Sequence, residues 1–148
     1  MDTLQPISSI MTTDLICLSP SDSVLAVHNV FSENRIHHIP IVNNGQLVGM
    51  VSKSDYLFFQ RGFAESEKDQ QIENLRLSAF TVNDIMTKGI AKLKSTDRIS
   101  VAIEIFNENL FHAIPIVDEQ KLIGILTTFD IISQLSLVSK EQKELNKV

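Results

Sequence analysis

The chain contains one pattern twice, and this duplication constrains its fold more than any other feature of the sequence. Residues Ile7 to Leu57 align with residues Val82 to Ile132 without a gap. About 16 of roughly 51 aligned positions are identical, and most of the others exchange one apolar residue for another. A repeat of this length is a complete folding unit. Because units of about 50 residues rarely bury enough apolar surface to be stable alone, we expect the two repeats to share an interface.

Composition and charge narrow the classes of protein that fit this chain. Of its 148 residues, 43% are hydrophobic and 21% are charged, as in an ordinary globular protein. The net charge of −5 argues against nucleic acid as a partner, since nucleic acid needs a basic face. A single cysteine, Cys17, excludes an intramolecular disulfide and a multi-cysteine metal site. We find no signal peptide and no apolar stretch of about 18 residues, so we expect a cytoplasmic protein without a membrane partner.

Apolar patterning predicts the same elements in both repeats. In the first repeat, residues 15–18 form a short apolar run, which predicts a buried strand. A helix follows, in which one face recurs at intervals of three and four residues. The positions on this face are Val24, Val27, His28 and Phe31 in the first repeat, and Ile99, Ala102, Ile103 and Phe106 in the second. Asn34 and Asn109 stand near the helix ends, where asparagine tolerates the left-handed conformation that stops a helix.

A hairpin and a second helix complete each repeat. Two β-rich runs around Asn44 and Gly45 predict a hairpin in the first repeat. The second repeat lacks the glycine, which leaves its turn open to a conformation other than that of the first. Each repeat is therefore an α+β unit with the order β-α-β-β-α and a small three-stranded sheet. We assign residues 6–60 and 82–137 to the repeats, 61–81 to a linker and 138–148 to a charged C-terminal tail. Within the linker, Ile72, Leu75 and Ala79 suggest a helix that touches the core with one side.

The motif Gly-h-h-Ser/Thr-x-x-Asp, where h is apolar, is the sharpest chemical feature of the sequence. It occupies residues 49–55 and 124–130, where a strand gives way to a helix. One interpretation is a capping box, in which the hydroxyl and the carboxylate satisfy the first turn of the helix. The other interpretation is a ligand site. Free N–H groups at a helix start suit a phosphate, and a carboxylate one turn later can accept from both hydroxyls of a ribose. Both interpretations can hold together.

Metal-binding and catalytic interpretations find little support in the sequence. His28 takes the place of Ile103 in the other repeat, so we expect it to pack at the core or its edge. His37 and His38 are neighbours in an extended segment and should point to opposite faces, so they cannot easily bind one ion together. No nucleophile elbow, zinc-protease motif or Walker loop is present. We therefore expect no metal site and no enzyme activity.

The motifs, in their order and spacing, resemble the cystathionine-β-synthase (CBS) domain. The resemblance rests on Ile-Met-Thr at 10–12 and 85–87, on the segments 34–42 and 109–117 with their Ile-Pro-Ile-Val, and on both copies of Gly-h-h-Ser/Thr-x-x-Asp. Two such domains in tandem are similar to a CBS pair, or Bateman module, over nearly the whole chain. The resemblance implies two β-α-β-β-α repeats packed sheet to sheet with pseudo-twofold symmetry. It also implies two clefts between the repeats, which bind adenosine-containing ligands in many family members.

By this resemblance, each cleft combines residues near the first strand and the proline of one repeat with the Ser/Thr-x-x-Asp of the other. One cleft would use Thr12, Ile16, His37 and His38 with Ile125, Thr127 and Asp130. The other would use Thr87, Ala91, His112 and Ala113 with Met50, Ser52, Ser54 and Asp55. The aspartate would bind ribose, the hydroxyls would help to bind phosphate, and the apolar residues would hold adenine. We expect the first cleft, with two histidines and Arg35 nearby, to prefer more phosphates.

The resemblance implies a stand-alone regulatory module. An adenine nucleotide (AMP, ADP or ATP, with S-adenosylmethionine less favoured) would be its regulatory ligand, and no cofactor is required. A ligand bound by both repeats would favour one relative orientation and signal to an effector protein. A homodimer of the module is also implied. The alternative is a ligand-free structural or dimerisation module, in which the two Ser/Thr-x-x-Asp motifs are only helix caps.

Overall fold

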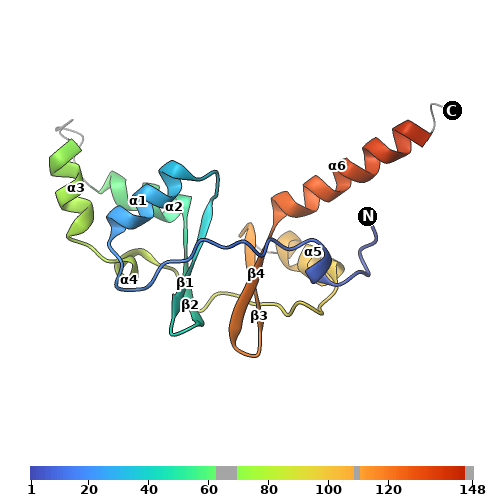
Figure 1. The fold of residues 1–148 in the computed structure, drawn as a ribbon, viewed down its shortest axis with the longest axis horizontal. Helices are drawn as coiled ribbons and strands as arrows, with labels where there is room; N and C mark the ends of the chain where they lie inside the picture. Colours follow the sequence, from blue (N-terminus) through green and yellow to red (C-terminus); the bar gives the residue numbers. More distant parts are fainter. Residues whose placement is uncertain (63–69, 109–110, 146–148) are drawn as a thin grey trace. The chain divides into compact units, whose positions relative to one another are not determined.

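The computed structural model describes residues 1–62, 70–108 and 111–145, and its elements are drawn in Figure 1. In chain order they are η1 (Ile7–Ser9), α1 (Val24–Glu33), β1 (His38–Asn43), β2 (Gln46–Ser52), α2 (Lys53–Arg61), α3 (Gln70–Ser78), α4 (Val82–Ile85), α5 (Ile99–Glu108), β3 (Ala113–Asp118), β4 (Lys121–Thr127) and α6 (Thr128–Leu145). Helices and antiparallel strands are mixed along the chain, which confirms the predicted α+β class. α6 continues to Leu145, so most of the predicted tail belongs to this helix.

The same β-hairpin occurs twice. β1 pairs with β2, and β3 pairs with β4, both antiparallel (Figure 1). Both ladders carry an irregularity at the equivalent position, between Ile41 and Val42 in the first and between Ile116 and Val117 in the second. The paired residues Ile39 and Val51 are fully buried, as are Ile114 and Leu126. Because a shift by one residue would turn these side chains to the opposite face, burial fixes the register of each hairpin.

The two hairpin turns adopt the same backbone conformation. Asn44 and Gly45 have φ values of 50° and 80°, as a type I′ turn requires at both central positions. Glu119 and Gln120 have φ values of 47° and 67°. The missing glycine left the second turn open to a different shape, but both of its central residues have positive φ as well. The second turn keeps its shape although neither residue is a glycine, because the two strands of the hairpin impose it.

The predicted strand at residues 15–18 is not present. Only Leu18 pairs, through an isolated parallel bridge to Ile41. Ile16 is 37% exposed and Cys17 is exposed, so the segment is not buried either. The second repeat behaves in the same way, with a single bridge between Leu93 and Ile116. The apolar run was insufficient evidence for a strand because one anchoring residue meets the sheet and its neighbours do not.

Two details of the helices differ from prediction. Asn34 ends α1 in an extended conformation, with φ −127° and ψ 145°, not in the left-handed one. Its side-chain Nδ2 and its backbone N–H both donate to the carbonyl oxygen of Val30, which closes the helix end by another route. Asn109 lies outside the described residues. In α3 the core residue is Leu77, which is 1% exposed. Of the predicted residues, Ile72 is half-buried, Leu75 is 72% exposed, and Ala79 follows the helix end and is exposed, so the predicted side is wrong at Leu75 and Ala79.

The chain divides into two compact units that do not coincide with the two repeats. Unit 1 comprises residues 1–15 and 91–148, and unit 2 comprises residues 16–90. Each unit therefore contains the hairpin of one repeat and the opening segment of the other. Ile7 belongs to the core of unit 1 with Ala102, Ile114, Ile116, Leu126 and Ile131. Val82, its equivalent, belongs to the core of unit 2 with Val24, Val27, Phe31, Ile39, Ile41, Val51, Tyr56 and Leu77.

Candidate functional site

The Ser/Thr-x-x-Asp motif of unit 2 forms a capping box at the start of α2. Asp55 Oδ2 accepts from the Ser52 backbone N–H at 2.9 Å and from the Ser52 hydroxyl at 2.7 Å. The Asp55 backbone N–H donates to Ser52 Oγ at 3.1 Å. These bonds satisfy donors that the first turn of a helix leaves without an intrahelical partner. The capping interpretation of this motif is confirmed.

Unit 1 builds the same box at the start of α6. Asp130 Oδ2 accepts from the Thr127 backbone N–H at 2.7 Å and from the Thr127 hydroxyl at 2.6 Å. The Asp130 backbone N–H donates to Thr127 Oγ1 at 3.2 Å. In both boxes the two bonds that the carboxylate accepts fall on the same oxygen, Oδ2. The other oxygen, Oδ1, is therefore left for a further interaction.

A threonine from the opposite repeat lies beside each box. Thr12 and Ile125 exchange two backbone hydrogen bonds, both 2.9 Å long. Thr87 and Met50 do the same, at 2.9 and 3.0 Å. These short antiparallel pairs tie each Ile-Met-Thr segment to the strand that leads into the capping box. The two motifs that the sequence shows far apart are thus neighbours within one unit.

The glycine of each motif makes this neighbourhood possible. A Cβ on Gly49 would lie 2.8 Å from Met86 Sδ and 2.9 Å from the Thr87 carbonyl oxygen. A Cβ on Gly124 would lie 2.8 Å from Met11 Sδ and 3.1 Å from the Thr12 carbonyl oxygen. Sequence reasoning missed this positioning role of the glycines and methionines. The signal was available, since both residue types recur at equivalent positions in the two repeats.

We call these two clusters the half-sites. The unit 1 half-site comprises Thr12, Ile125, Thr127 and Asp130, and the unit 2 half-site comprises Thr87, Met50, Ser52, Ser54 and Asp55. In unit 1 the Thr12 hydroxyl donates to Asp130 Oδ1 at 3.4 Å, which is a long bond. Over the described residues, no equivalent bond joins Thr87 to Asp55. Met50 and Ile125 are only 6% and 7% exposed, whereas Thr12 and Thr87 are exposed.

Each predicted cleft also includes residues outside its half-site. These remaining residues belong to the other unit. Ile16, His37 and His38 belong to unit 2, whereas Ala91, His112 and Ala113 belong to unit 1. The carbonyl of His37 accepts from the Lys53 N–H at 2.8 Å, and that of His112 accepts from the Thr128 N–H at 3.0 Å. The segment before each proline is thereby fixed to the helix start of its own unit. Both histidine side chains are exposed.

A third capping box lies outside the two half-sites. Asp84 Oδ2 accepts from the Thr81 N–H at 2.7 Å and from the Thr81 hydroxyl at 2.8 Å, at the start of α4. These hydrogen bonds lower the pKa of Asp84, because they stabilise its charged form. Asp84 is exposed and belongs to no half-site. It therefore provides an internal reference for the purely structural role of a Thr-x-x-Asp box.

His28 has a structural environment. Its Nδ1 lies 2.6 Å from the hydroxyl of Tyr56, and the two rings are 5.9 Å apart between centroids. Tyr56 is 4% exposed. Its burial, together with the nearby negative charge of Glu73, raises the pKa of Tyr56 to about 12. His28 is half-buried beside Tyr56, which confirms the expected packing role at the core or its edge and adds a hydrogen bond that the sequence did not predict. The described residues include no group of three or more His, Cys, Asp or Glu that could hold a metal ion.

The comparison with protein families matches the repeat pattern. A model of the CBS domain matches residues 7–62 and, a second time, residues 82–137. The chain belongs to the CBS domain family. Because the two matches follow one another along the chain, this protein carries a tandem CBS pair, as the resemblance predicted. Each match spans an opening Ile-Met-Thr segment and a Gly-h-h-Ser/Thr-x-x-Asp motif.

Individual CBS proteins are similar to this one over most of its length. Protein MJ1225 of Methanocaldococcus jannaschii, described as uncharacterized, is 26% identical over 134 residues, which are 89% of this chain and 48% of the relative. The structure of CBSX2 of Arabidopsis thaliana in complex with AMP has a TM-score of 0.75 and 24% identity, covering 91% of this chain and 98% of CBSX2. The CBS domain pair of MJ0100, in complex with 5′-methylthioadenosine and S-adenosyl-L-methionine, has a TM-score of 0.70 and 19% identity, covering 90% and 97%.

These CBS relatives support the fold of this chain, and the curated ones are longer than it. The two structural similarities, both below 25% identity, support the CBS-pair fold. This chain spans between 22% and 48% of the length of four of the curated relatives that it matches. In the part of this CBS pair that the structure describes, no helix is both long and apolar enough to cross a bilayer.

Proposed function

We propose that this CBS pair is a regulatory module that binds an adenosine-containing nucleotide of the AMP, ADP or ATP class. The observation that carries the proposal is the arrangement of each half-site. A threonine hydroxyl, a helix start and a carboxylate with one oxygen outside its cap lie together within one unit. Such a carboxylate oxygen can accept from a ribose hydroxyl, and the helix start favours a phosphate.

The ligand class draws support from the CBS proteins named above. CBSX2 was solved with AMP, and the MJ0100 pair was solved with 5′-methylthioadenosine and S-adenosyl-L-methionine. These three ligands share an adenosine moiety and differ in charge. We therefore propose that the half-sites recognise the ribose and the adenine of the ligand. The helix start of each half-site would favour the first phosphate, and the groups that distinguish ligands with further phosphates would lie outside the half-sites.

Each site is proposed to be completed by the other unit. Ile16, His37 and His38 would face a ligand on the unit 1 half-site, and Ala91, His112 and Ala113 would face one on the unit 2 half-site. A ligand held by both units favours the arrangement of units in which it binds best. The same free energy is available to shift the affinity for an effector protein. We propose a regulatory role without catalysis, and a homodimer as the functional form.

The rival function is a ligand-free structural or dimerisation module. The confirmed capping boxes are the observation that favours it, since a box explains Ser52, Asp55, Thr127 and Asp130 without any ligand. The exposed apolar side chains of α6 also suit an assembly role. They are Phe129, Ile132, Leu135 and Leu137, with exposed fractions of 74%, 62%, 50% and 51%.

Thermal melting against a set of adenosine ligands distinguishes the two functions. A ligand at a hundred times its Kd stabilises the folded state by about 2.7 kcal/mol, which raises Tm by several degrees. We expect such a rise with AMP, ADP or ATP, and a smaller one with S-adenosylmethionine. If no adenosine ligand raises Tm at millimolar concentration, the proposed function is wrong and the structural module is favoured.

Three matched substitutions separate ligand binding from capping. Asp55→Asn, Asp130→Asn and Asp84→Asn each weaken a capping box, so each should cost about 0.5–2 kcal/mol of unfolding free energy. Only the first two remove a carboxylate from a half-site. We expect Asp84→Asn to keep the full ligand-induced rise in Tm, and Asp55→Asn and Asp130→Asn to lose part of it. An equal loss in all three variants would contradict the half-site assignment.

A further inference from the structure

The two half-sites share their backbone and their carboxylate, but the residues next to these groups differ in charge. Each half-site joins one Ile-Met-Thr segment to one capping box of the same unit. The joints are the paired backbone hydrogen bonds of Thr12 with Ile125 and of Thr87 with Met50. Within each unit, the residues that follow the threonine and the residues that open the helix therefore lie at the edge of one half-site.

The first difference is the first residue of the helix. Lys53 opens α2 in unit 2, and Thr128 opens α6 in unit 1. Their N–H groups donate to the carbonyl oxygens of His37 and His112, at 2.8 and 3.0 Å. The two positions are thus equivalent in backbone structure, and both side chains are half-buried. Of the two helix starts, that of unit 2 has a positive charge beside it and that of unit 1 does not.

A second lysine follows the threonine of the unit 2 half-site. Lys88 stands next to Thr87, whereas Thr13 stands next to Thr12. Lys88 and Thr13 are both exposed, so neither side chain is committed to the core. A lysine ammonium is a compact charge on a flexible stem, which lets it reach a phosphate that is not held next to its own backbone.

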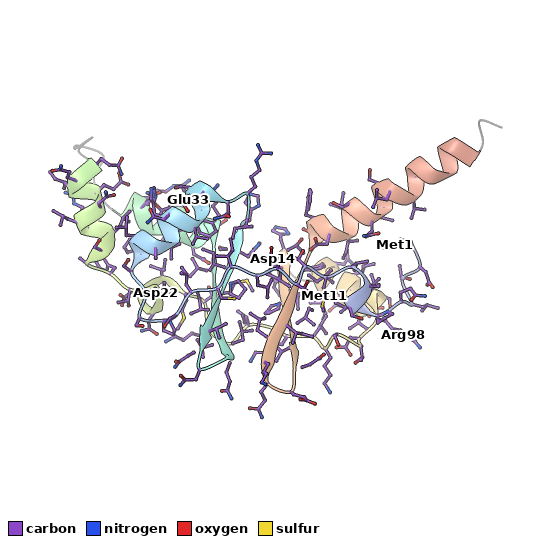
Figure 2. The ribbon with its side chains drawn as sticks, viewed as in Figure 1. Met1, Met11, Asp14, Asp22, Glu33 and Arg98 are labelled. Atoms are coloured by element: carbon purple, nitrogen blue, oxygen red, sulfur yellow. The ribbon has the colours of Figure 1, made fainter. Side chains whose placement is uncertain are left out.

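The next residue along the chain increases the difference in charge. Unit 1 has Asp14 at this position, and unit 2 has Gly89. Asp14 is exposed, and Figure 2 labels it together with Met11 on this stretch of the chain. Taken over the Ile-Met-Thr segment, the two residues after it and the capping box, unit 2 has two lysines and one aspartate. The same positions of unit 1 have two aspartates and neither lysine nor arginine.

The second residue of the helix differs in polarity. It is Ser54 in unit 2 and Phe129 in unit 1, and both are exposed. A serine hydroxyl can donate to a phosphate oxygen, whereas a phenyl ring cannot. A ring beside a ligand offers apolar surface to an uncharged group, but it does not replace the hydrogen bonds that water makes to a phosphate. The polarity of this position thus changes in the same direction as the charges.

We propose that Lys53 and Lys88 give the two half-sites different ligands. The unit 2 half-site binds ADP and ATP more tightly than AMP, and the unit 1 half-site binds AMP more tightly than ATP. This inference rests on the proposed function, because the half-sites must first bind an adenosine ligand. The carboxylate of each capping box repels phosphates in both units alike, so the neighbouring charges decide the difference. Each further phosphate adds negative charge, which the two lysines attract and Asp14 repels.

The sequence predicts the opposite preference, since it places Arg35, His37 and His38 beside the unit 1 half-site. All three residues belong to unit 2. Within that unit His38 stands opposite Ser52 in the β1–β2 ladder, so the two side chains leave the sheet on the same face. His38 is therefore a neighbour of the unit 2 half-site as well. The two assignments predict opposite results in one experiment.

Calorimetry with one half-site disabled at a time measures the two preferences. Asp130→Asn keeps the unit 2 half-site intact, and this variant should bind ATP about fivefold more tightly than AMP in metal-free buffer, the gain expected from one close charge pair in water. Asp55→Asn keeps the unit 1 half-site intact and should bind AMP more tightly than ATP. Equal or reversed preferences, or loss of ATP binding in Asp130→Asn, would overturn the inference. A parent protein that binds neither nucleotide would instead contradict the proposed function.

Exchange of the distinguishing residues tests them without disabling a half-site. Lys53→Thr and Lys88→Thr give unit 2 the residues of unit 1. Each should weaken ATP binding by about threefold to fivefold and change AMP binding less, because AMP carries fewer charges. The loss should shrink at high salt, which screens the charges. Unchanged ATP binding in both variants would overturn the role of the lysines.

The matched control is Arg61→Thr. Arg61 is exposed and lies in the last turn of α2, at the other end of the helix from Lys53. Its replacement removes one positive charge from the same unit, as Lys53→Thr does, but not from the edge of the half-site. We expect ATP binding to change little in this variant. A loss equal to that of Lys53→Thr would overturn the inference, because net charge alone would then explain the preference.

Discussion

Unit 2 closes its hairpin with Asn44 and Gly45, whereas unit 1 closes the equivalent hairpin with Glu119 and Gln120. Both turns have two consecutive positive φ angles. Only the first pair consists of residues that adopt such angles at little cost. The two hairpins nevertheless share their register, including the irregularity at the same position. The comparison shows that the paired, buried strands determine the backbone conformation of the turn. The turn residues change only the free energy that this conformation costs.

The helices of the two units also differ in a pair of side chains that contact each other in unit 2. His28 and Tyr56 form a hydrogen-bonded pair in unit 2, and the aligned positions in unit 1 hold Ile103 and Ile131. A polar pair has been exchanged for an apolar pair at both positions together. This is expected, because a single exchange would leave one buried polar group without its partner. The methionine, threonine and glycine that bring the opening segment of one repeat to the hairpin of the other are, by contrast, the same in both units.

The strongest test of this comparison is a methyl group at the shared glycines. Gly49→Ala and Gly124→Ala each force a Cβ against a backbone oxygen and a methionine sulfur, which should cost about 1–3 kcal/mol of unfolding free energy. Gly49→Ala should cost more, since its contact with the carbonyl is 2.9 Å, against 3.1 Å for Gly124. Urea unfolding measures both values.

The control for the glycines is Gly62→Ala. Gly62 has a φ of −69°, which alanine adopts freely, and its Cβ would meet only the Phe59 carbonyl oxygen at 3.3 Å. We expect a small effect there. If Gly49→Ala and Gly124→Ala were as mild as this control, close approach of the exchanged segments would not explain the glycines.

The polar pair of unit 2 gives the next largest effect. Tyr56→Phe removes the hydroxyl that lies 2.6 Å from His28 Nδ1, which should cost about 1–2 kcal/mol. His28→Leu alone should cost a similar amount of unfolding free energy, because it leaves the Tyr56 hydroxyl without this hydrogen-bond partner. The double variant makes the pair apolar, as in unit 1, so its loss should be smaller than the sum of the two. Additive losses in chemical denaturation would contradict coupling between the two side chains.

Alkaline pH tests the same pair without mutation. The pKa of Tyr56 is raised to about 12 from its ordinary value of 10, mainly by burial. Because the folded state disfavours the phenolate, this contribution to stability is complete below pH 10 and is lost as pH rises from 10 to 12. Tyr56 is the chain's one tyrosine, so ultraviolet absorbance follows its ionisation alone. Tyr56→Phe should abolish this part of the pH dependence, and an ionisation at the ordinary pKa would contradict the buried pair.

Local patterns predicted the elements that depend on one segment at a time. The helical face with Val24, Val27 and Phe31, the hairpin at Asn44 and Gly45, and the caps at Ser52 and Thr127 could all be recognised from spacing. The buried side of α3 could not. Its apolar residues offered two faces, and only contact with the rest of unit 2 selects Leu77 over Leu75.

The composition of the half-sites was visible in the sequence only in part. The family resemblance brought Thr12 together with Asp130, and a hydrogen bond joins them within unit 1. It did not reveal that Gly124 and Met11 hold this arrangement, because their contact links opposite ends of the chain. The apolar pattern of residues 15–18 likewise predicts a strand that the structure does not contain. An apolar run shows that a segment meets the protein, but not that only Leu18 pairs with a hairpin.

The smallest expected effect comes from exchanging the two turns. Glu119→Asn with Gln120→Gly places the residues of the unit 2 turn in unit 1 and should raise stability by about 0.5–1 kcal/mol, since a left-handed conformation is less costly for asparagine and glycine. The reverse exchange, Asn44→Glu with Gly45→Gln, should lower stability by a similar amount. Neither exchange should alter the ligand-induced rise in Tm, because the turns lie at the far end of each hairpin from the capping box. Thermal melting measures both. If the two exchanges change stability in the same direction, the strands do not impose one turn shape on both hairpins, and the turn residues take part in determining it.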